Sequence, residues 1–430
     1  MPERMSVFDL AELAADVGPN PRTIGVLLEL EGPAPDLDAV RAGMRARLGL
    51  VPRLAQRMRR VALGAGRPVW EDVAVDLDHH VRGRSARAVD LPVVAAEILS
   101  EPLDAARPWW TLTVVDLPAE GRSALIWSSH HAMADGPSVL RAALAVLQGG
   151  PEQALPPRQA VPLSGQLARQ AWNVRARSIR GAVRLPVQLV GLRELGASSG
   201  VRVPASPLNR PITAGYALRT VDVEVDELRA GARACNATVN DALLWAWGSA
   251  LHRQLRAAGA AGAPVVVSCT VTRPSTRTEN RVGAIRFAVP APGESVAVDL
   301  AALADDTRRR KRLISGSSWW LVAQLFRAVG SLGLYRGFVE RQRSITSLLT
   351  NMRGPVEPLT VLGLRVTRAV PLATLVGNVT VLAAALTCGG RMVVTIMCSP
   401  EAEGQVDELI ADLGAGLAAV AALRPTPPEG

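Results

Sequence analysis

The chain has 430 residues, 48% of them hydrophobic, so it can form two or three domains with sizeable cores and is not an intrinsically disordered protein. Its formal net charge of +9 suits anionic partners such as phosphate-bearing cofactors or acidic lipid headgroups. Only 3% of the residues are aromatic, and no basic-aromatic RNA-binding pattern is present, which argues against nucleic acid as a partner.

Cysteine usage and the N-terminus predict the compartment. The four cysteines have neither the spacing of a zinc site nor that of a disulfide framework, so we expect small buried thiols in a reducing compartment. The N-terminus lacks a signal-peptide pattern, which predicts a cytoplasmic protein. The uncharged run at 370–390 is long enough to cross a bilayer, but its proline, glycines and β-branched residues favour two core strands joined by a turn.

Strands and helices alternate in the first half of the chain. Apolar or alternating segments predict strands at 23–30, 69–70, 73–81, 110–117 and 123–129, the last two forming a hairpin. Apolar residues at helical spacing predict helices at 36–48, 92–99 and 138–147. Residues 151–210 then predict a crossover, with a basic amphipathic helix or helix pair at 166–195 between proline-bearing loops.

The second half repeats this order of elements. Strands are expected at 217–225, 265–272 and 284–289, followed by two late strands. Helices are expected from 226, at 240–257, across 300–340 and at 405–423. We therefore predict a pseudo-duplicated α+β protein with a ligand site between two halves. The predicted divisions are a first domain at 1–150, a crossover at 151–210, a second domain at 211–423 and a flexible tail at 424–430.

Two of the five histidines, His130 and His131, stand side by side at the end of a predicted strand. Adjacent side chains on a strand point to opposite faces, so the pair is a poor joint metal ligand, and we predict no metal. One histidine should face a cavity and the other should pack internally. Asp135 follows within reach of the next helix, where capping is a plainer role than proton transfer. Gly136 is expected to allow a tight backbone path.

A histidine can take the proton of a hydroxyl group while that oxygen attacks an activated carbonyl such as a thioester. No GxSxG nucleophile elbow, which needs a strand before it and a helix after it, is present to suggest a serine hydrolase. On spacing alone, a core histidine pair explains His130 and His131 equally well. His79 and His80 form such a pair without an acid at the matching position.

Several segments in a fixed order resemble one known family. His130 to Gly136 match the HHxxxDG motif of the CoA-dependent acyltransferase superfamily. The flanking segments resemble the bacterial wax ester synthase/acyl-CoA:diacylglycerol acyltransferase family. They are Pro102-Leu103-Asp104, Arg107-Pro108-Trp109-Trp110, Pro207-Leu208-Asn209-Arg210, Ala237 to Leu244, and Thr350-Asn351-Met352-Arg353-Gly354-Pro355. The matches run from near residue 5 to near residue 420.

This resemblance implies two chloramphenicol-acetyltransferase-like domains around an active-site tunnel. It implies acyl-CoA as co-substrate, diacylglycerol or a long-chain alcohol as acceptor, and no permanently bound cofactor. His131 is then the general base, and His130 and Asp135 support it. Asn240 and Asp241 match the start of an inter-domain helix, although Asn240 is equally readable as an N-cap. Asn351 and Gly354 would shape a loop beside the cleft, or form an ordinary Gly-Pro turn.

The chain departs from the family pattern at three places. Trp109 replaces a leucine, which leaves Trp110 as an adjacent bulky residue near the acyl or acceptor pocket. Met352-Arg353 and Cys388-Gly389-Gly390 also differ from the usual residues. The predicted base His131 is retained, but the identity of the acceptor substrate stays open. Alternatives are another hydroxyl or amine acceptor, such as a specialised metabolite, and a catalytically weak lipid-binding protein.

A basic segment at 308–312 precedes an aromatic and apolar one at 319–326. This order is typical of an amphipathic helix at an anionic membrane or lipid-droplet surface, which predicts a protein peripheral to the inner face of the membrane or to lipid droplets. A helix with one core face and a solvated basic start explains the same residues.

Overall fold

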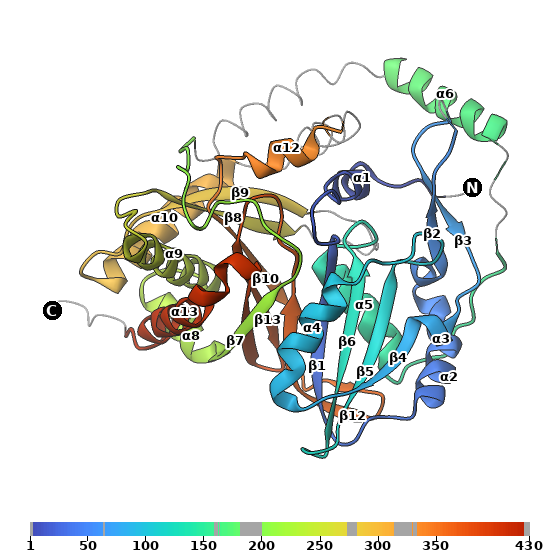
Figure 1. Cartoon of the computed structure of the whole chain (residues 1–430), viewed down its shortest axis with the longest axis horizontal. Helices are drawn as coiled ribbons and strands as arrows, with labels where there is room; N and C mark the ends of the chain where they lie inside the picture. Colours follow the sequence, from blue (N-terminus) through green and yellow to red (C-terminus); the bar gives the residue numbers. More distant parts are fainter. Residues whose placement is uncertain are drawn as a thin grey trace.

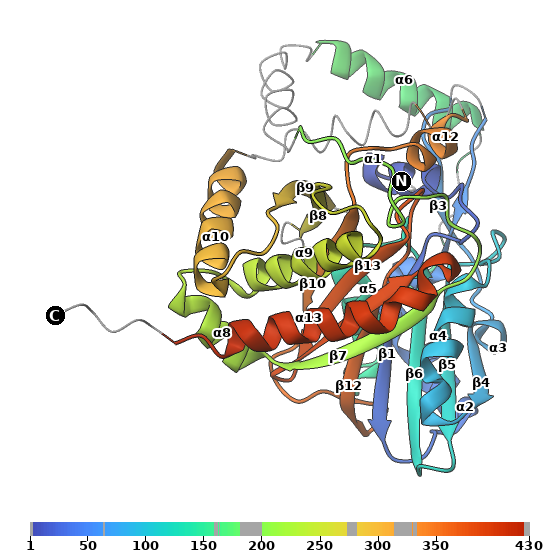
Figure 2. The same cartoon turned by 60° about the vertical axis from the view of Figure 1, so that its left-hand side comes forward.

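The computed structural model describes residues 3–62, 65–158, 162, 164–180, 200–272, 282–313, 329 and 333–424. Its main feature is a pair of six-stranded sheets, one on each side of the molecule in Figure 1. Helices α8 (Val225–Ala234), α9 (Val239–Ala257) and α13 (Val406–Ala421) cover the second sheet in both views (Figures 1 and 2). The predicted α+β class with two similar halves is confirmed.

The first sheet has the strand order β11-β12-β1-β6-β5-β4, and only β4 and β5 run parallel. Its strands are β1 (Thr23–Glu31), β4 (Val81–Ser85), β5 (Trp110–Leu117), β6 (Arg122–His130), β11 (Thr360–Val361) and β12 (Leu364–Leu372). Ile24, Val26 and Leu28 of β1 face one core, and Leu27 faces another. Both faces of β1 are buried, which explains its continuous apolar sequence.

The second sheet has the order β7-β14-β13-β10-β8-β9, with β10 parallel to both β13 and β8. Its strands are β7 (Ala217–Glu224), β8 (Val265–Thr272), β9 (Val282–Val289), β10 (Ser347–Arg353), β13 (Val381–Cys388) and β14 (Arg391–Cys398). A separate ribbon pairs β2 (Gln56–Arg59) with β3 (Val69–Asp72).

Most predicted helices lie close to their predicted positions, but the helices at 7–14 and 77–80 are not among the predicted ones, and residues 181–195 of the predicted crossover helix lie outside the described residues. In the first half they are α1 (Val7–Ala14), α2 (Leu37–Arg47), α3 (Leu77–His80), α4 (Leu91–Ser100), α5 (Gly136–Leu147) and α6 (Ser164–Arg180). In the second half they are α8 (Val225–Ala234), α9 (Val239–Ala257), α10 (Val296–Leu313), α12 (Tyr335–Glu340) and α13 (Val406–Ala421). Among the described residues, no helix is long and apolar enough to cross a bilayer. All four cysteines are free thiols.

The two halves share a core, and the second half contributes a strand to the first sheet. Leu99 of α4 packs in one apolar cluster with Leu27 of β1, Leu218 of β7 and Leu382 of β13. Strand β12 comes from the second half of the sequence but pairs with β1 in the first sheet, with Val26 opposite Pro371. The halves are therefore joined by both packing and backbone pairing.

Two predictions about strands need correction. The strand expected at 73–81 is wrong, because β2 is the partner of β3 and the Asp76 side chain caps the short helix α3 by accepting from the His79 N–H. Residues 370–390 do contain two strand segments, but they lie in different sheets and do not pair with each other. Residues 314–328 and 425–430 lie outside the described residues, and so do most of the predicted interfacial helix and the tail.

Candidate active site

The strand β6 ends between the two adjacent histidines. His130 is its last residue and lies opposite Thr23 of β1. The backbone N–H of His131 donates to the carbonyl oxygen of Arg22, the residue before β1, at 2.7 Å, and a turn begins with the Met133 N–H donating to the His130 carbonyl oxygen at 2.9 Å. This break gives the two histidines different surroundings.

The His130 side chain is buried, and both of its ring nitrogens have partners. Its Nδ1 accepts a 3.0 Å hydrogen bond from the Ala132 backbone N–H, and its Nε2 lies 3.2 Å from Oδ2 of Asp16. Because Nδ1 accepts, the ring proton belongs on Nε2, which donates to Asp16. Burial raises the pKa of Asp16, but the hydrogen bond and charge of His130 outweigh it and lower the pKa below its usual value.

The His131 side chain is 19% exposed and lies beside an ion pair. Its Nδ1 is 3.9 Å from Oε2 of Glu12, and the same carboxylate oxygen pairs closely with the Arg22 guanidinium. Burial raises the pKa of Glu12, but the charges of His131 and Arg22 and the Arg22 hydrogen bond outweigh it and lower the pKa to about 2. His131 therefore lies next to a permanently charged carboxylate.

Asp135 and Gly136 form the start of α5. Asp135 is the N-cap, and its Oδ1 accepts a 2.9 Å hydrogen bond from the Ser138 backbone N–H. A Cβ on Gly136 would lie 2.5 Å from the Sδ atom of Met352. Gly136 therefore makes room for the end of β10, which lies against the motif.

Trp109 and Trp110 occupy different environments behind the histidines. The Trp109 ring lies 4.8 Å from the His130 ring, centroid to centroid, and 6.2 Å from Trp70. The Trp110 ring is stacked between His80 and Trp127, at 4.3 and 5.0 Å, and its Nε1–H donates to the Leu54 carbonyl oxygen at 2.8 Å. These contacts account for Trp110 as a core residue, and a substrate contact for either tryptophan stays a prediction.

The predicted residues of the second half lie on α9 and β10. The alternative role of Asn240 as an N-cap is wrong, because Thr238 caps α9 in a capping box with Asp241. Asp241 is buried and also accepts a 2.7 Å hydrogen bond from the Thr307 hydroxyl. These contacts tie α9 to α10, within the second half.

Asn351 and Gly354 lie near the end of β10. The Oδ1 atom of Asn351 is buried and has no hydrogen-bond partner within the described ranges. The Gly354 N–H donates to the Thr387 carbonyl oxygen at 2.8 Å, and its α-carbon faces Leu140 of α5. The structure thus brings this loop to the helix that follows the motif.

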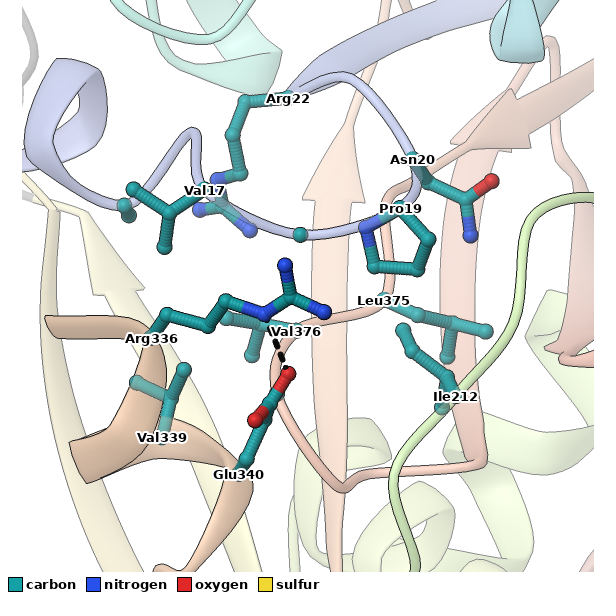
Figure 3. Close-up of a pocket in the computed structure, with 13 residues that line it drawn as sticks. Val17, Pro19, Asn20, Arg22, Ile212, Arg336, Val339, Glu340, Leu375 and Val376 are labelled. Atoms are coloured by element: carbon teal, nitrogen blue, oxygen red, sulfur yellow. Dashed lines mark hydrogen bonds and ion pairs between the residues drawn. The ribbon is translucent and has the colours of Figure 1, made fainter.

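One cavity lies beside Arg22, the partner of the His131 backbone, and a second one borders the motif itself. The first, of about 350 Å³ including space open to solvent, is lined by the loop before β1, by α12 and by the β12–β13 connection. Figure 3 shows Arg336 of α12, paired with Glu340, reaching toward the loop that carries Val17, Pro19 and Arg22. The second, of about 290 Å³, is apolar and lined by Trp127, Ser129, Met133 and residues of α5. In the described part of the chain, no three His, Cys, Asp or Glu side chains form a group that could hold a metal ion.

Sequence reasoning missed Glu12, Asp16 and Arg22, which surround the histidines. Ser6 and Asp9 form a capping box at the start of α1, a signal readable from the sequence. It predicts a helix whose end places Glu12 and Asp16, four residues apart, on one side. The histidines that they contact lie more than 100 residues away, and local patterns carry no information about such contacts.

Residues 5–243 match the family model of the wax ester synthase/diacylglycerol acyltransferase catalytic domain, and residues 278–420 match the C-terminal domain of the same family. The chain belongs to this family. The resemblance seen in the sequence is thereby confirmed over most of the chain. A Mycobacterium bovis protein, whose name proposes a diacylglycerol O-acyltransferase, is 28% identical over 225 residues, 46% of this chain and 44% of that protein. The match therefore spans less than half the length of this curated family relative.

Solved structures share the fold. A wax ester synthase/diacylglycerol acyltransferase from Marinobacter aquaeolei VT8 has a TM-score of 0.68 at 20% identity, over 97% of this chain and 98% of that one. A starter condensation domain of rhizomide synthetase, solved with C8-CoA and Leu-SNAC, has a TM-score of 0.64 at 14% identity, over 98% and 94% of the chains. The predicted acyltransferase-like fold is confirmed.

Proposed function

We propose that this protein transfers a fatty acyl group from acyl-CoA to the hydroxyl of a lipophilic alcohol, with His131 as general base. The observation that carries this proposal is the contrast between the two histidines. His130 is buried with both ring nitrogens engaged, by the Ala132 N–H and by Asp16. His131 is partly exposed at a strand end, beside a charged carboxylate that can stabilise a protonated imidazole.

The chemistry needs one positioned base. The neutral imidazole of His131 takes the hydroxyl proton while the alcohol oxygen attacks the thioester carbonyl. The tetrahedral intermediate then collapses, the carbon–sulfur bond breaks, and the CoA sulfur leaves with the proton held by His131. An ester and free CoA are the products. No metal or permanently bound cofactor takes part in this scheme.

Acyl-CoA and the alcohol would meet in a tunnel between the two domains, which we assign to 1–150 and 211–423 with 151–210 as the crossover. Asn351 supports this location, because its buried carbonyl oxygen is able to accept a hydrogen bond from a ligand. Met352 packs toward Gly136, which places the β10 loop beside the motif. Trp109, Asn240, Asp241 and Gly354 stay predicted cleft residues in this proposal, whereas the contacts of Trp110 favour a core role over its predicted cleft role.

The acceptor is the finer part of the proposal, with diacylglycerol giving triacylglycerol and a long-chain alcohol giving a wax ester. The test is CoA thiol release from oleoyl-CoA with either diolein or hexadecanol. Wild type should release thiol in an acceptor-dependent way, and His131→Ala should lower this rate at least about 100-fold. His79→Ala is a matched control, because it removes a histidine of the other adjacent pair and should leave the rate unchanged.

Two outcomes would contradict the proposal. Wild type that releases no thiol with either alcohol excludes these acceptors and favours another acceptor or a lipid-binding role. Equal rates for wild type and His131→Ala exclude His131 as the base, whichever acceptor is used.

A peripheral location at an anionic membrane or lipid droplet is the second part of the proposal. The basic segment 308–312 lies at the end of α10, where Arg308 pairs with Asp305, and Arg309 and Arg310 pair with Asp306. These pairs lower the local net charge, so membrane attraction depends on the excess of basic over acidic residues in this segment. Arg→Glu changes at 309 and 312 should weaken sedimentation with anionic liposomes. Unchanged sedimentation would exclude this segment as the membrane contact.

A further inference from the structure

Two carboxylates at the end of the N-terminal helix each face one of the two histidines. Glu12 lies in the last turn of α1, and Asp16 follows the C-cap residue Ala15. Their spacing of four residues places both on the same side of the chain. Asp16 contacts Nε2 of His130 at 3.2 Å, and Glu12 lies 3.9 Å from Nδ1 of His131. Each histidine of the motif thus has its own acidic partner.

Arg22 fixes this arrangement through three separate groups. Its guanidinium pairs with Glu12, and its backbone N–H donates to Oδ1 of Asp16 at 3.1 Å. Its carbonyl oxygen accepts the 2.7 Å hydrogen bond from the His131 N–H. One residue therefore holds both carboxylates and the backbone of His131 in a fixed relation.

We propose that Glu12 is the positioning residue for His131, favouring the ring proton on Nδ1 so that Nε2 takes the alcohol proton. This inference rests on the proposed role of His131 as base. At 3.9 Å the contact is an attraction between charges rather than a hydrogen bond. The attraction grows when His131 becomes an imidazolium, which is the state formed as the alcohol attacks. Glu12 thereby stabilises the transition state more than the ground state.

Among the described residues, Glu12 is the acid in ionic contact with His131. Asp16 is engaged by His130, and the Arg22 guanidinium pairs with Glu12. Tyr335 of α12 and Tyr216 before β7 also face this group, but burial raises the pKa of each to about 12. Both tyrosines are therefore neutral at working pH. Since the pKa of Glu12 is lowered to about 2, its carboxylate is charged at working pH.

The test is the pH profile of acyl transfer by Glu12→Gln, which keeps the shape of the side chain and removes its charge. We expect kcat to fall roughly 10-fold or more and the acidic limb to move to lower pH by about one unit, because His131 loses the charge that stabilises its protonated form. Glu12→Asp restores the charge and should move the acidic limb most of the way back to its wild-type position. Glu224→Gln, which removes a carboxylate from a surface pair with Arg391, is the matched control.

A merely structural role would lower the rate of Glu12→Gln without moving the acidic limb, and that result overturns the proposal. A second measurement does not depend on turnover. Nitrogen-15 NMR of labelled histidines, with the His131 signal assigned by its loss in His131→Ala, reads the tautomer and the titration midpoint directly. We expect the Nδ1–H form in wild type and a midpoint about one unit lower in Glu12→Gln.

The two experiments separate the two proposals. Absence of acyl transfer by wild type contradicts the proposed function, while the NMR titration still decides the role of Glu12. Active wild type with an unchanged His131 tautomer and midpoint in Glu12→Gln overturns the role of Glu12 and leaves the proposed function standing.

Discussion

The carboxylate of Asp135 caps the helix after the motif by accepting a 2.9 Å hydrogen bond from the Ser138 backbone N–H. Asp135→Asn keeps an oxygen acceptor at this position, so it should keep near wild-type stability and acyl transfer. Asp135→Ala removes the cap and should lower the free energy of unfolding by about 1 kcal/mol. Urea unfolding measures both. An inactive but fully stable Asp135→Asn would instead assign Asp135 to proton transfer.

Replacing either of two glycines near the histidines by alanine should lower the stability by different amounts. A Cβ on Gly25 would lie 2.1 Å from the Trp127 carbonyl oxygen, inside the central pairing of β1 with β6, where neither backbone can move. Gly25→Ala should therefore cost at least about 2 kcal/mol of stability. At Gly136 the clash is with the flexible end of Met352, so Gly136→Ala should cost about 1 kcal/mol or less. Equal losses in thermal or urea unfolding would contradict this distinction.

Trp110 should matter for stability rather than for substrate choice. Its ring is fully buried between His80 and Trp127, and its Nε1–H is bonded to Leu54. Trp110→Leu should cost about 3 kcal/mol and leave the acyl chain-length profile of the folded enzyme unchanged. Trp172→Leu is the matched control, because Trp172 of α6 is 68% exposed. A shifted chain-length profile in Trp110→Leu would place this residue in the acyl pocket.

His80 should make the protein sensitive to mild acid. Burial lowers the pKa of His80 from 6.5 to about 4, although the hydrogen bond to the Trp110 carbonyl oxygen opposes this shift. On acidification, His80 is therefore protonated at a higher pH in the unfolded chain than in the folded protein. The free energy of unfolding should fall as the pH drops from about 6.5 to about 4. His80→Gln should flatten the unfolding free energy over this window. An unchanged slope would show that other groups cause the acid sensitivity.

Local patterns predicted most elements, because periodicity and capping act over a few residues. The apolar run of β1, the hairpin of β5 and β6, and the helical spacing of α13 each matched the structure within a few residues. The strand expected at 73–81 failed because the Asp76 cap favoured a helical turn over alternation. The pairing of β12 with β1 joins residues more than 300 positions apart, and no local pattern specifies such a partner.

Local sequence patterns also predict the candidate site only in part. The motif and the capping role of Asp135 are readable from spacing, and the Thr238-Asp241 capping box has an equally local signature in the sequence. Glu12, Asp16 and Arg22 depend on how α1 folds back against the end of β6. Their role is therefore visible only when α1 and β6 are seen together.

Strand β12 also limits how this protein can be divided. It covers the edge of β1, whose other edge pairs with β6. A fragment ending before residue 360 would leave β1 with a row of unpaired N–H and carbonyl groups, which promotes edge-to-edge aggregation. The motif-bearing half should therefore be insoluble when produced alone and should be rescued by co-expression with the remainder of the chain.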